Sequence, residues 1–163
     1  MLAILHIGEQ QSEVVVQTDA GSGVAHSLAL GSVALAQAYF KPYPPRPLNL
    51  ENAIAAAEDE LFKLRHLAEG WPRPLLQSSD ESIRQIAVAC GVGAGAVLTV
   101  DAVERAFNDL VALSSGGRSA FASAAGAAAP WVADPRAGAV LLILREFLHH
   151  MKLDAIKVID NIN

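Results

Sequence analysis

A polar segment at residues 8–13 is the first place to look for chemistry, because it lies between two short apolar runs, residues 2–7 and 14–16. Apolar runs rich in Ile, Leu and Val that are broken by glycine and polar residues are typical of two strands joined by a turn. Such a turn presents backbone N–H groups at one end of a sheet, where many folds hold phosphate. The turn is therefore the first candidate for an anion site.

Other residues that are able to do chemistry have a simpler structural interpretation, which we favour. His6 is a candidate metal ligand or, when protonated, an anion contact, but no second ligand accompanies it in the sequence and a polar residue at a strand end is the simpler role. Cys90 is expected to be a small buried hydrophobic residue. His149 and His150 fall near the end of an expected helix, where cationic side chains suit the helix dipole.

A glycine series at residues 91–95 follows an apolar run and is a second candidate for phosphate binding. Its spacing, Gly91-x-Gly93-x-Gly95, differs from the G-x-G-x-x-G of dinucleotide-binding proteins. A remnant of a phosphate loop and an ordinary turn explain the series almost equally well. Ser12 and Glu13 are open to a local interpretation too, as side chains that bond the backbone of their own turn.

The composition limits the classes of protein to consider. A chain of 163 residues with 52% hydrophobic residues is expected to form one domain with a substantial core. The net charge of −5, without a basic cluster, argues against a nucleic-acid partner. The longest apolar run, residues 137–144, is too short to span a membrane. A single cysteine and the absence of a basic leader predict a cytoplasmic protein.

The pattern of apolar residues predicts an α/β fold with the order β-β-β-α-α-β-α-α-β. A mixed five-stranded sheet is expected, with a three-strand antiparallel meander followed by parallel strands and with helices packed on it. Residues 69–81 are expected to be a loop. The predicted strands are residues 2–7, 14–16, 24–30, 83–90 and 155–159, and the predicted helices are residues 33–40, 50–67, 100–113 and 135–151.

Several short motifs, in the same order along the chain, resemble the second domain of the exopolyphosphatase / guanosine pentaphosphate phosphatase family. That domain opens with Asp-Ile-Gly-Gly-Gly-Ser-Thr-Glu, where this chain has His-Ile-Gly-Glu-Gln-Gln-Ser-Glu at residues 6–13. The further matches are residues 27–33, the prolines of residues 44–47, the glycines of residues 91–95, residues 137–139 and residues 158–160. The resemblance implies a single lobe of the actin-like ATPase, ribonuclease H-like fold over residues 1–163, with the family's first domain absent.

The departures from the family fall on its chemical positions. The Asp that helps to hold a divalent cation in the family corresponds to His6, and Mg²⁺ prefers hard oxygen ligands. Two glycines of the phosphate loop correspond to Glu9 and Gln10, and the Glu9 carboxylate would repel an anion. The resemblance therefore implies a degenerate phosphate-binding loop, without catalytic or metal-ligating residues, made of His6, Gly8, Gln10, Gln11, Ser12, Gly91 and Gly93.

Three functions follow from the resemblance and its departures. The favoured one is a non-catalytic module that binds a phosphate-type anion or regulates a partner. The alternative is a phosphohydrolase of the exopolyphosphatase class, in which a dimer or a separate chain supplies the missing domain and Mg²⁺ takes part. The third is a structural assembly protein, since a lobe without its partner domain exposes apolar surface, and a homodimer is therefore expected.

Overall fold

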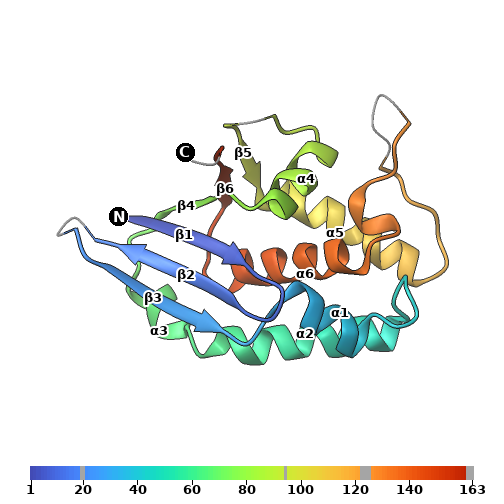
Figure 1. Ribbon diagram of the computed structural model, residues 1–163, viewed down its shortest axis with the longest axis horizontal. Helices are drawn as coiled ribbons and strands as arrows, with labels where there is room; N and C mark the ends of the chain where they lie inside the picture. Colours follow the sequence, from blue (N-terminus) through green and yellow to red (C-terminus); the bar gives the residue numbers. More distant parts are fainter. Residues whose placement is uncertain (19–20, 94, 122–125, 161–163) are drawn as a thin grey trace.

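The computed structural model describes residues 1–18, 21–93, 95–121 and 126–160, which form a mixed sheet with helices packed against it (Figure 1). The first three strands are β1 (Leu2–Ile7), β2 (Ser12–Gln17) and β3 (Gly23–Leu28). β2 pairs antiparallel with both of its neighbours. The predicted antiparallel meander is therefore confirmed.

The other half of the sheet contains three strands where the sequence predicted two. β4 (Leu75–Ser78) pairs parallel with β1, and β6 (Ala155–Val158) pairs parallel with β4. β5 (Val97–Thr99) pairs antiparallel with β6, which gives the order β3-β2-β1-β4-β6-β5. The mixed sheet is thus confirmed, but it has six strands and not five.

The strand predicted at residues 83–90 is wrong, because this segment forms helix α4 (Glu81–Ala89). Its buried residues are Ile83, Ile86 and Ala87, which follow the three- and four-residue spacing of a helix. Val88, by contrast, is largely exposed on the far side of the helix. A short run of this kind has enough apolar residues to suggest a strand, and only its spacing shows the helix.

The loop predicted at residues 69–81 is wrong in the same region, because it contains β4. Pro72, Pro74 and the polar residues that follow suggested a connection. Leu76 and Ser78 are nevertheless fully buried, since β4 lies between β1 and β6 in the sheet. Pairing with two distant strands, and not local propensity, makes this segment a strand.

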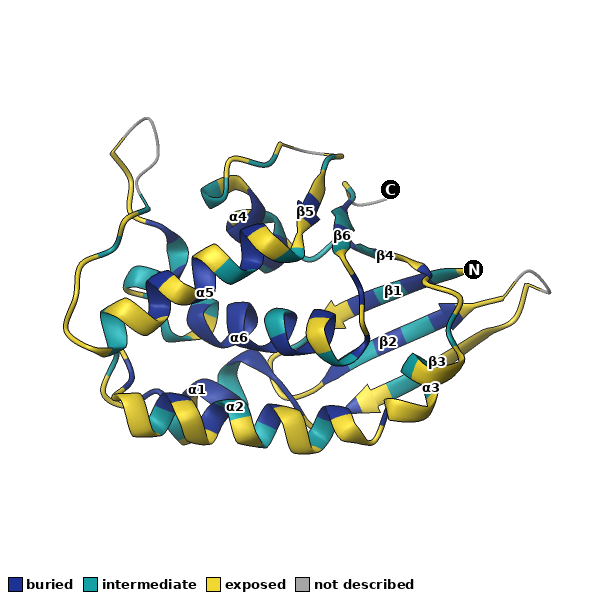
Figure 2. Cartoon of the chain, turned by 180° about the vertical axis from the view of Figure 1, so that it is seen from behind, coloured by how far each residue is buried: buried dark blue, intermediate teal, exposed yellow. Residues whose placement is uncertain are grey.

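The four helices that the sequence predicted lie close to their expected positions. Helix α6 (Pro135–His150) is mostly buried and contacts α1, α2, α4 and α5, as Figure 2 shows by its dark colour. The predicted helix at residues 50–67 is divided in two, with the break at residues 63 and 64. The remaining elements are α1 (Ser32–Tyr39), α2 (Pro47–Phe62), α3 (Arg65–Gly70), α5 (Val100–Ser114) and η1 (Pro130–Val132).

The core lies between the helices and one face of the sheet. Along each of β1, β2, β4 and β6, every second side chain is buried, and the others are partly or largely exposed. Leu5 and Val14 are examples of the buried row, and Leu75 belongs to the exposed one. None of the described helices combines the length and hydropathy that a membrane span requires.

Candidate functional site

The turn between β1 and β2 is held closed by its own backbone. The N–H of Gly8 donates to the carbonyl of Gln11 at 3.0 Å. A Cβ at Gly8 would lie 2.6 Å from that carbonyl oxygen, so the turn requires glycine there. Glu9, Gln10 and Gln11 are exposed at the tip.

The carbonyls of this turn cap helix α1. The N–H of Ser32 donates to the Gly8 carbonyl at 2.9 Å, and the N–H of Val33 donates to the Glu9 carbonyl at 3.0 Å. Gly31 makes this approach possible, since a Cβ there would lie 2.3 Å from the Glu9 oxygen. The first donors of α1 are therefore engaged by the protein itself.

Ser12, one of the residues predicted to bind phosphate, is fully buried at the end of the turn. Its hydroxyl donates to the carbonyl of Leu30 at 2.6 Å. This bond ties the start of β2 to the segment that leads into α1. The side chain therefore joins two parts of the fold and does not face the surface.

His6 is paired with a carboxylate that sequence reasoning missed. Its Nδ1 lies 2.7 Å from Oδ1 of Asp80, while Oδ2 of Asp80 accepts the backbone N–H of Ile7 at 2.7 Å. The parallel pairing of β1 with β4 brings the two residues together, because Asp80 follows the end of β4. The sequence signal for Asp80 is weak, since it depends on recognising β4 as a strand.

A cavity of about 210 Å³ lies beside the turn, at the N-terminal ends of α1, α4 and α6. Each of the three helices contributes polar side chains or small residues to its wall. The cavity is lined by Glu9, Ser32, Ser82, Gln85, Asp134, Arg136, Ala137 and Val140. None of the seven residues predicted to bind phosphate is among them, and Glu9, which lies between two of the seven, was expected to repel an anion.

The wall of the cavity carries groups that attract an anion and groups that repel one. Asp134 caps α6, because its carboxylate accepts the N–H of Arg136 at 2.9 Å. Helix α4 has no side-chain cap, since the carboxylate of its N-cap residue, Asp80, turns to His6 and Ile7. The uncapped end of α4 and the Arg136 guanidinium therefore favour an anion, whereas the carboxylates of Glu9 and Asp134 oppose one, and Asp134 lies 3.7 Å from Arg136.

Gly91 and Gly93 lie away from the turn. They follow the C-terminal end of α4, a helix of nine residues that is roughly 13 Å long. Gly91 has a φ of +79° and its N–H donates to the Val88 carbonyl, an arrangement that ends a helix. The structure therefore does not bring the two predicted glycine segments together at one site.

The region does not fit a magnesium ion. Both oxygens of Asp80 are engaged, one by His6 and one by the Ile7 N–H. The position that holds an Asp in the resembled family provides an imidazole nitrogen, which is a poor ligand for Mg²⁺. Among the described residues, no group of three or more His, Cys, Asp or Glu side chains is arranged to hold a metal ion.

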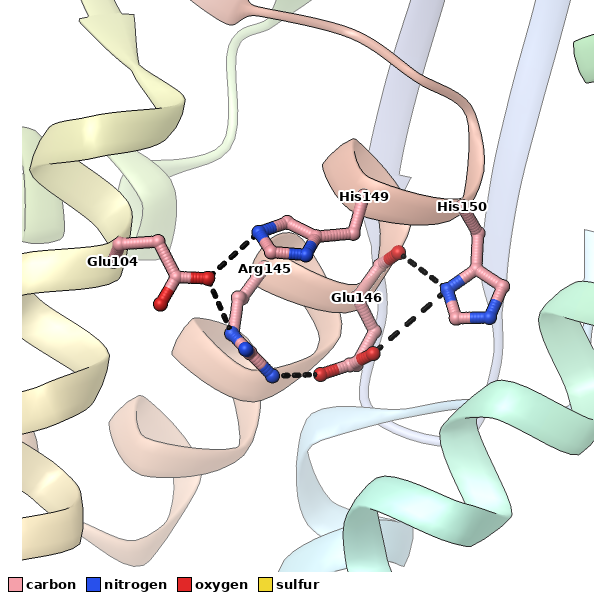
Figure 3. A network of polar contacts seen from close by, with 5 residues as sticks. All are labelled: Glu104, Arg145, Glu146, His149 and His150. Atoms are coloured by element: carbon pink, nitrogen blue, oxygen red, sulfur yellow. Dashed lines mark hydrogen bonds and ion pairs between the residues drawn. The ribbon is translucent and has the colours of Figure 1, made fainter.

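A second polar cluster joins α5 to the C-terminal half of α6 (Figure 3). Oε1 of Glu104 lies 2.8 Å from Nε of Arg145 and 2.7 Å from Nε2 of His149. Arg145 also binds Glu146 at 2.5 Å, and Nδ1 of His150 lies 3.8 Å from the other Glu146 oxygen. Burial raises the pKa of Glu146, although Arg145 acts in the opposite direction.

No protein-family model matches the chain, and no curated protein sequence matches it. Solved structures do match, over 98% of this chain. They include the PPX-GPPA enzyme of Aquifex aeolicus, with 19% identity and a TM-score of 0.73, and an exopolyphosphatase from Cytophaga hutchinsonii, with 15% identity and a TM-score of 0.72. A third match is an exopolyphosphatase-like protein with 12% identity and a TM-score of 0.71.

The chain spans about half the length of these solved structures, 53% of the first and 54% of the third. Its fold is therefore that of a domain-sized part of Ppx/GppA proteins. The family resemblance predicted from the short motifs is confirmed at the level of the fold. The lobe-like architecture, a mixed sheet with helices, is confirmed with it.

Proposed function

We propose that the chain is a module that binds a phosphate-type anion and does not hydrolyse phosphoanhydrides unaided. The observation that carries the proposal is the cavity at which the N-terminal ends of α1, α4 and α6 meet, with Arg136 in its wall. A helix N-terminus carries a partial positive charge, and one without a side-chain cap, as in α4, also presents N–H donors; both properties favour anions.

The anion is proposed to lie against α4 and Arg136, and not in the turn itself. The first donors of α1 are engaged by the Gly8 and Glu9 carbonyls, whereas α4 has no side-chain cap. Ser82 adds a hydroxyl and Gln85 an amide on the same wall. The proposed site thus keeps the predicted ligand class but moves the contacts to α4 and α6, away from the seven predicted residues: His6, Gly8, Gln10, Gln11, Ser12, Gly91 and Gly93.

The same cavity is the reason for proposing that the chain does not hydrolyse phosphoanhydrides unaided. The cavity carries carboxylates at Glu9 and Asp134, and the Asp134 carboxylate already caps α6. The chain also covers only 53% of the PPX-GPPA enzyme of Aquifex aeolicus.

Isothermal titration with inorganic phosphate and with tripolyphosphate tests the proposal. Arg136→Gln should weaken binding roughly threefold, and Glu9→Gln should strengthen it by a similar factor, as expected for one exposed charge. Arg65→Gln, on α3, is the control and should leave the affinity unchanged. Absence of heat with both anions, or identical affinities in all three variants, would contradict the proposed site.

The alternative function is phosphohydrolysis of the exopolyphosphatase class with a second copy or a separate chain. The likeness of fold to two proteins whose names include exopolyphosphatase favours it. Release of phosphate from polyphosphate by the purified chain with Mg²⁺ would support this alternative. It would also contradict the proposal that the chain does not hydrolyse phosphoanhydrides unaided. Gly8→Trp should then abolish release, because a Cβ at Gly8 would already lie 2.6 Å from the Gln11 carbonyl.

A further inference from the structure

Another cavity, of about 390 Å³, is lined on one side by helix α4 and on the other by residues 121 and 127–130. The α4 residues in its wall are 81, 84, 85, 88 and 89, which have the spacing of a single helix face. Ile83, Ile86 and Ala87, on the other face of α4, are buried in the core. The cavity therefore lies on the side of α4 that the core does not use.

Most of the wall of this cavity is apolar. Val88 and Ala89, near the C-terminal end of α4, face it together with Phe121 and the Ala-Ala-Ala-Pro segment of residues 127–130. Val88 is 63% exposed. Cavities of this size, with mainly apolar walls and a few polar groups, are typical of sites that bind small molecules.

The wall opposite α4 is held in place by a buried carboxylate, Asp109 on α5. Asp109 accepts hydrogen bonds from the Ser119 hydroxyl at 2.6 Å, the Ala120 N–H at 2.7 Å and the Trp131 indole N–H at 2.8 Å. The Phe121 ring packs edge-on against Trp131, with centroids 5.0 Å apart. A wall that is fixed in this way loses little conformational freedom when a ligand binds.

The polar side chains of the cavity, Glu81, Arg84 and Gln85, come from the first half of α4. The Arg84 guanidinium donates to Oε2 of Glu81 at 2.7 Å and lies 3.8 Å from Oδ1 of Asp160. A ligand anion would therefore meet two carboxylates, and a ligand cation would meet the guanidinium. This charge balance favours an uncharged polar group, for which the Gln85 amide has both a donor and an acceptor.

We propose that this cavity binds a small uncharged molecule with an apolar body and one hydrogen-bonding end. The apolar body lies against Val88, Phe121 and Pro130, and the polar end lies against Gln85. A volume of about 390 Å³ corresponds to roughly a dozen water-sized groups, which suits a small molecule. Of the residues that line this cavity and the proposed anion site, only Gln85 is shared.

Isothermal titration of the whole chain with octanol, octanoate and octylammonium tests the proposal, because the three probes share one apolar chain and differ in charge. Octanol should bind, and the two charged probes should bind at least roughly tenfold more weakly. Val88→Asp should weaken octanol binding by a similar factor, since it places a charge at the apolar end of the cavity. Val111→Asp on α5, where the valine is 38% exposed, is the matched control and should leave the affinity unchanged. Thermal melts show whether both variants are folded.

Two further variants locate the bound octanol. Glu81→Gln removes one of the two carboxylates near Arg84, so it should strengthen octanoate binding roughly threefold and leave octanol binding unchanged. Arg136→Gln, which tests the proposed anion site, should not change octanol binding, so the two proposals fail separately.

Three results would overturn the proposal of an uncharged ligand in this cavity. The first is the absence of heat with octanol, and the second is equal or tighter binding of either charged probe. The third is a loss of octanol affinity that is the same in Val88→Asp and Val111→Asp, or that also occurs in Arg136→Gln.

Discussion

At the N-terminal end of α6, Asp134 and Arg136 line an open cavity, whereas near its C-terminal end Arg145 and Glu146 bind each other and their neighbours. Arg136 is 63% exposed and its nearest carboxylate is 3.7 Å away, whereas the Arg145 side chain is 21% exposed and makes two close ion pairs. The same helix thus carries a cation available to a ligand, Arg136, at one end and charges used for stability at the other.

Removing an arginine from each end measures this difference most directly. Arg145→Ala should lower the free energy of unfolding by about 3–5 kcal/mol, because it leaves the buried Glu146 without its closest partner. It also removes a guanidinium that lies 4.5 Å from the centre of the Phe107 ring.

The matched variant Arg136→Ala should cost less than about 0.5 kcal/mol, as is usual for an exposed surface residue. Urea denaturation of both variants measures the two values. Equal losses of unfolding free energy would mean that Arg136 stabilises the fold as much as Arg145 does, and that the two ends of α6 do not differ in this respect.

Asp80→Ala tests the His6–Asp80 pair beside the cavity. The expected loss of unfolding free energy lies between those of Arg145→Ala and Arg136→Ala. The variant removes the acceptor of the His6 ring and of the Ile7 N–H, and we expect a loss of about 2 kcal/mol. Asp80→Asn retains an acceptor for the Ile7 N–H and should lose roughly half as much. If both variants are as stable as the wild type in urea, the pair only positions His6 and does not stabilise the fold.

The sequence predicts the parts of the fold that depend on local pattern. Apolar runs on either side of a polar turn predict β1 and β2. Thr99, directly before α5, caps that helix by accepting the Ala102 N–H at 3.2 Å. The predicted helix at residues 135–151 is confirmed by α6. Local periodicity, capping and turn residues are enough for these elements.

Elements and sites that depend on distant pairing are not predicted. β4 is a strand because β1 and β6 pair on either side of it, and the sequence of residues 75–78 does not show this. Without β4, the meeting of His6 with Asp80 is hidden. The cavity is hidden as well, because it is formed by the ends of α1, α4 and α6, which are far apart in the sequence.

Glu146→Gln changes how stability depends on pH and tests why the C-terminal cluster of α6 tolerates a buried carboxyl. Burial raises the pKa of Glu146 above its ordinary value of 4.5, against the opposing effects of Arg145 and His150, while Glu58 adds to the rise. The folded chain therefore holds this proton more tightly than the unfolded chain. The resulting stabilisation is complete below about pH 4.5 and is lost as the pH rises through the raised value.

Glutamine does not titrate, so the stability of Glu146→Gln relative to the wild type should increase as the pH rises from about 4 to about 7. Urea denaturation at several pH values measures this slope, and Glu51→Gln, at an exposed position on α2, is the control. If the difference in stability between Glu146→Gln and the wild type is constant with pH, or moves in favour of the wild type as the pH rises, the bond to Arg145 outweighs the effect of burial on the pKa of Glu146. The carboxyl would then be stabilised in its charged form, and the cluster would resist acid less well than its burial suggests.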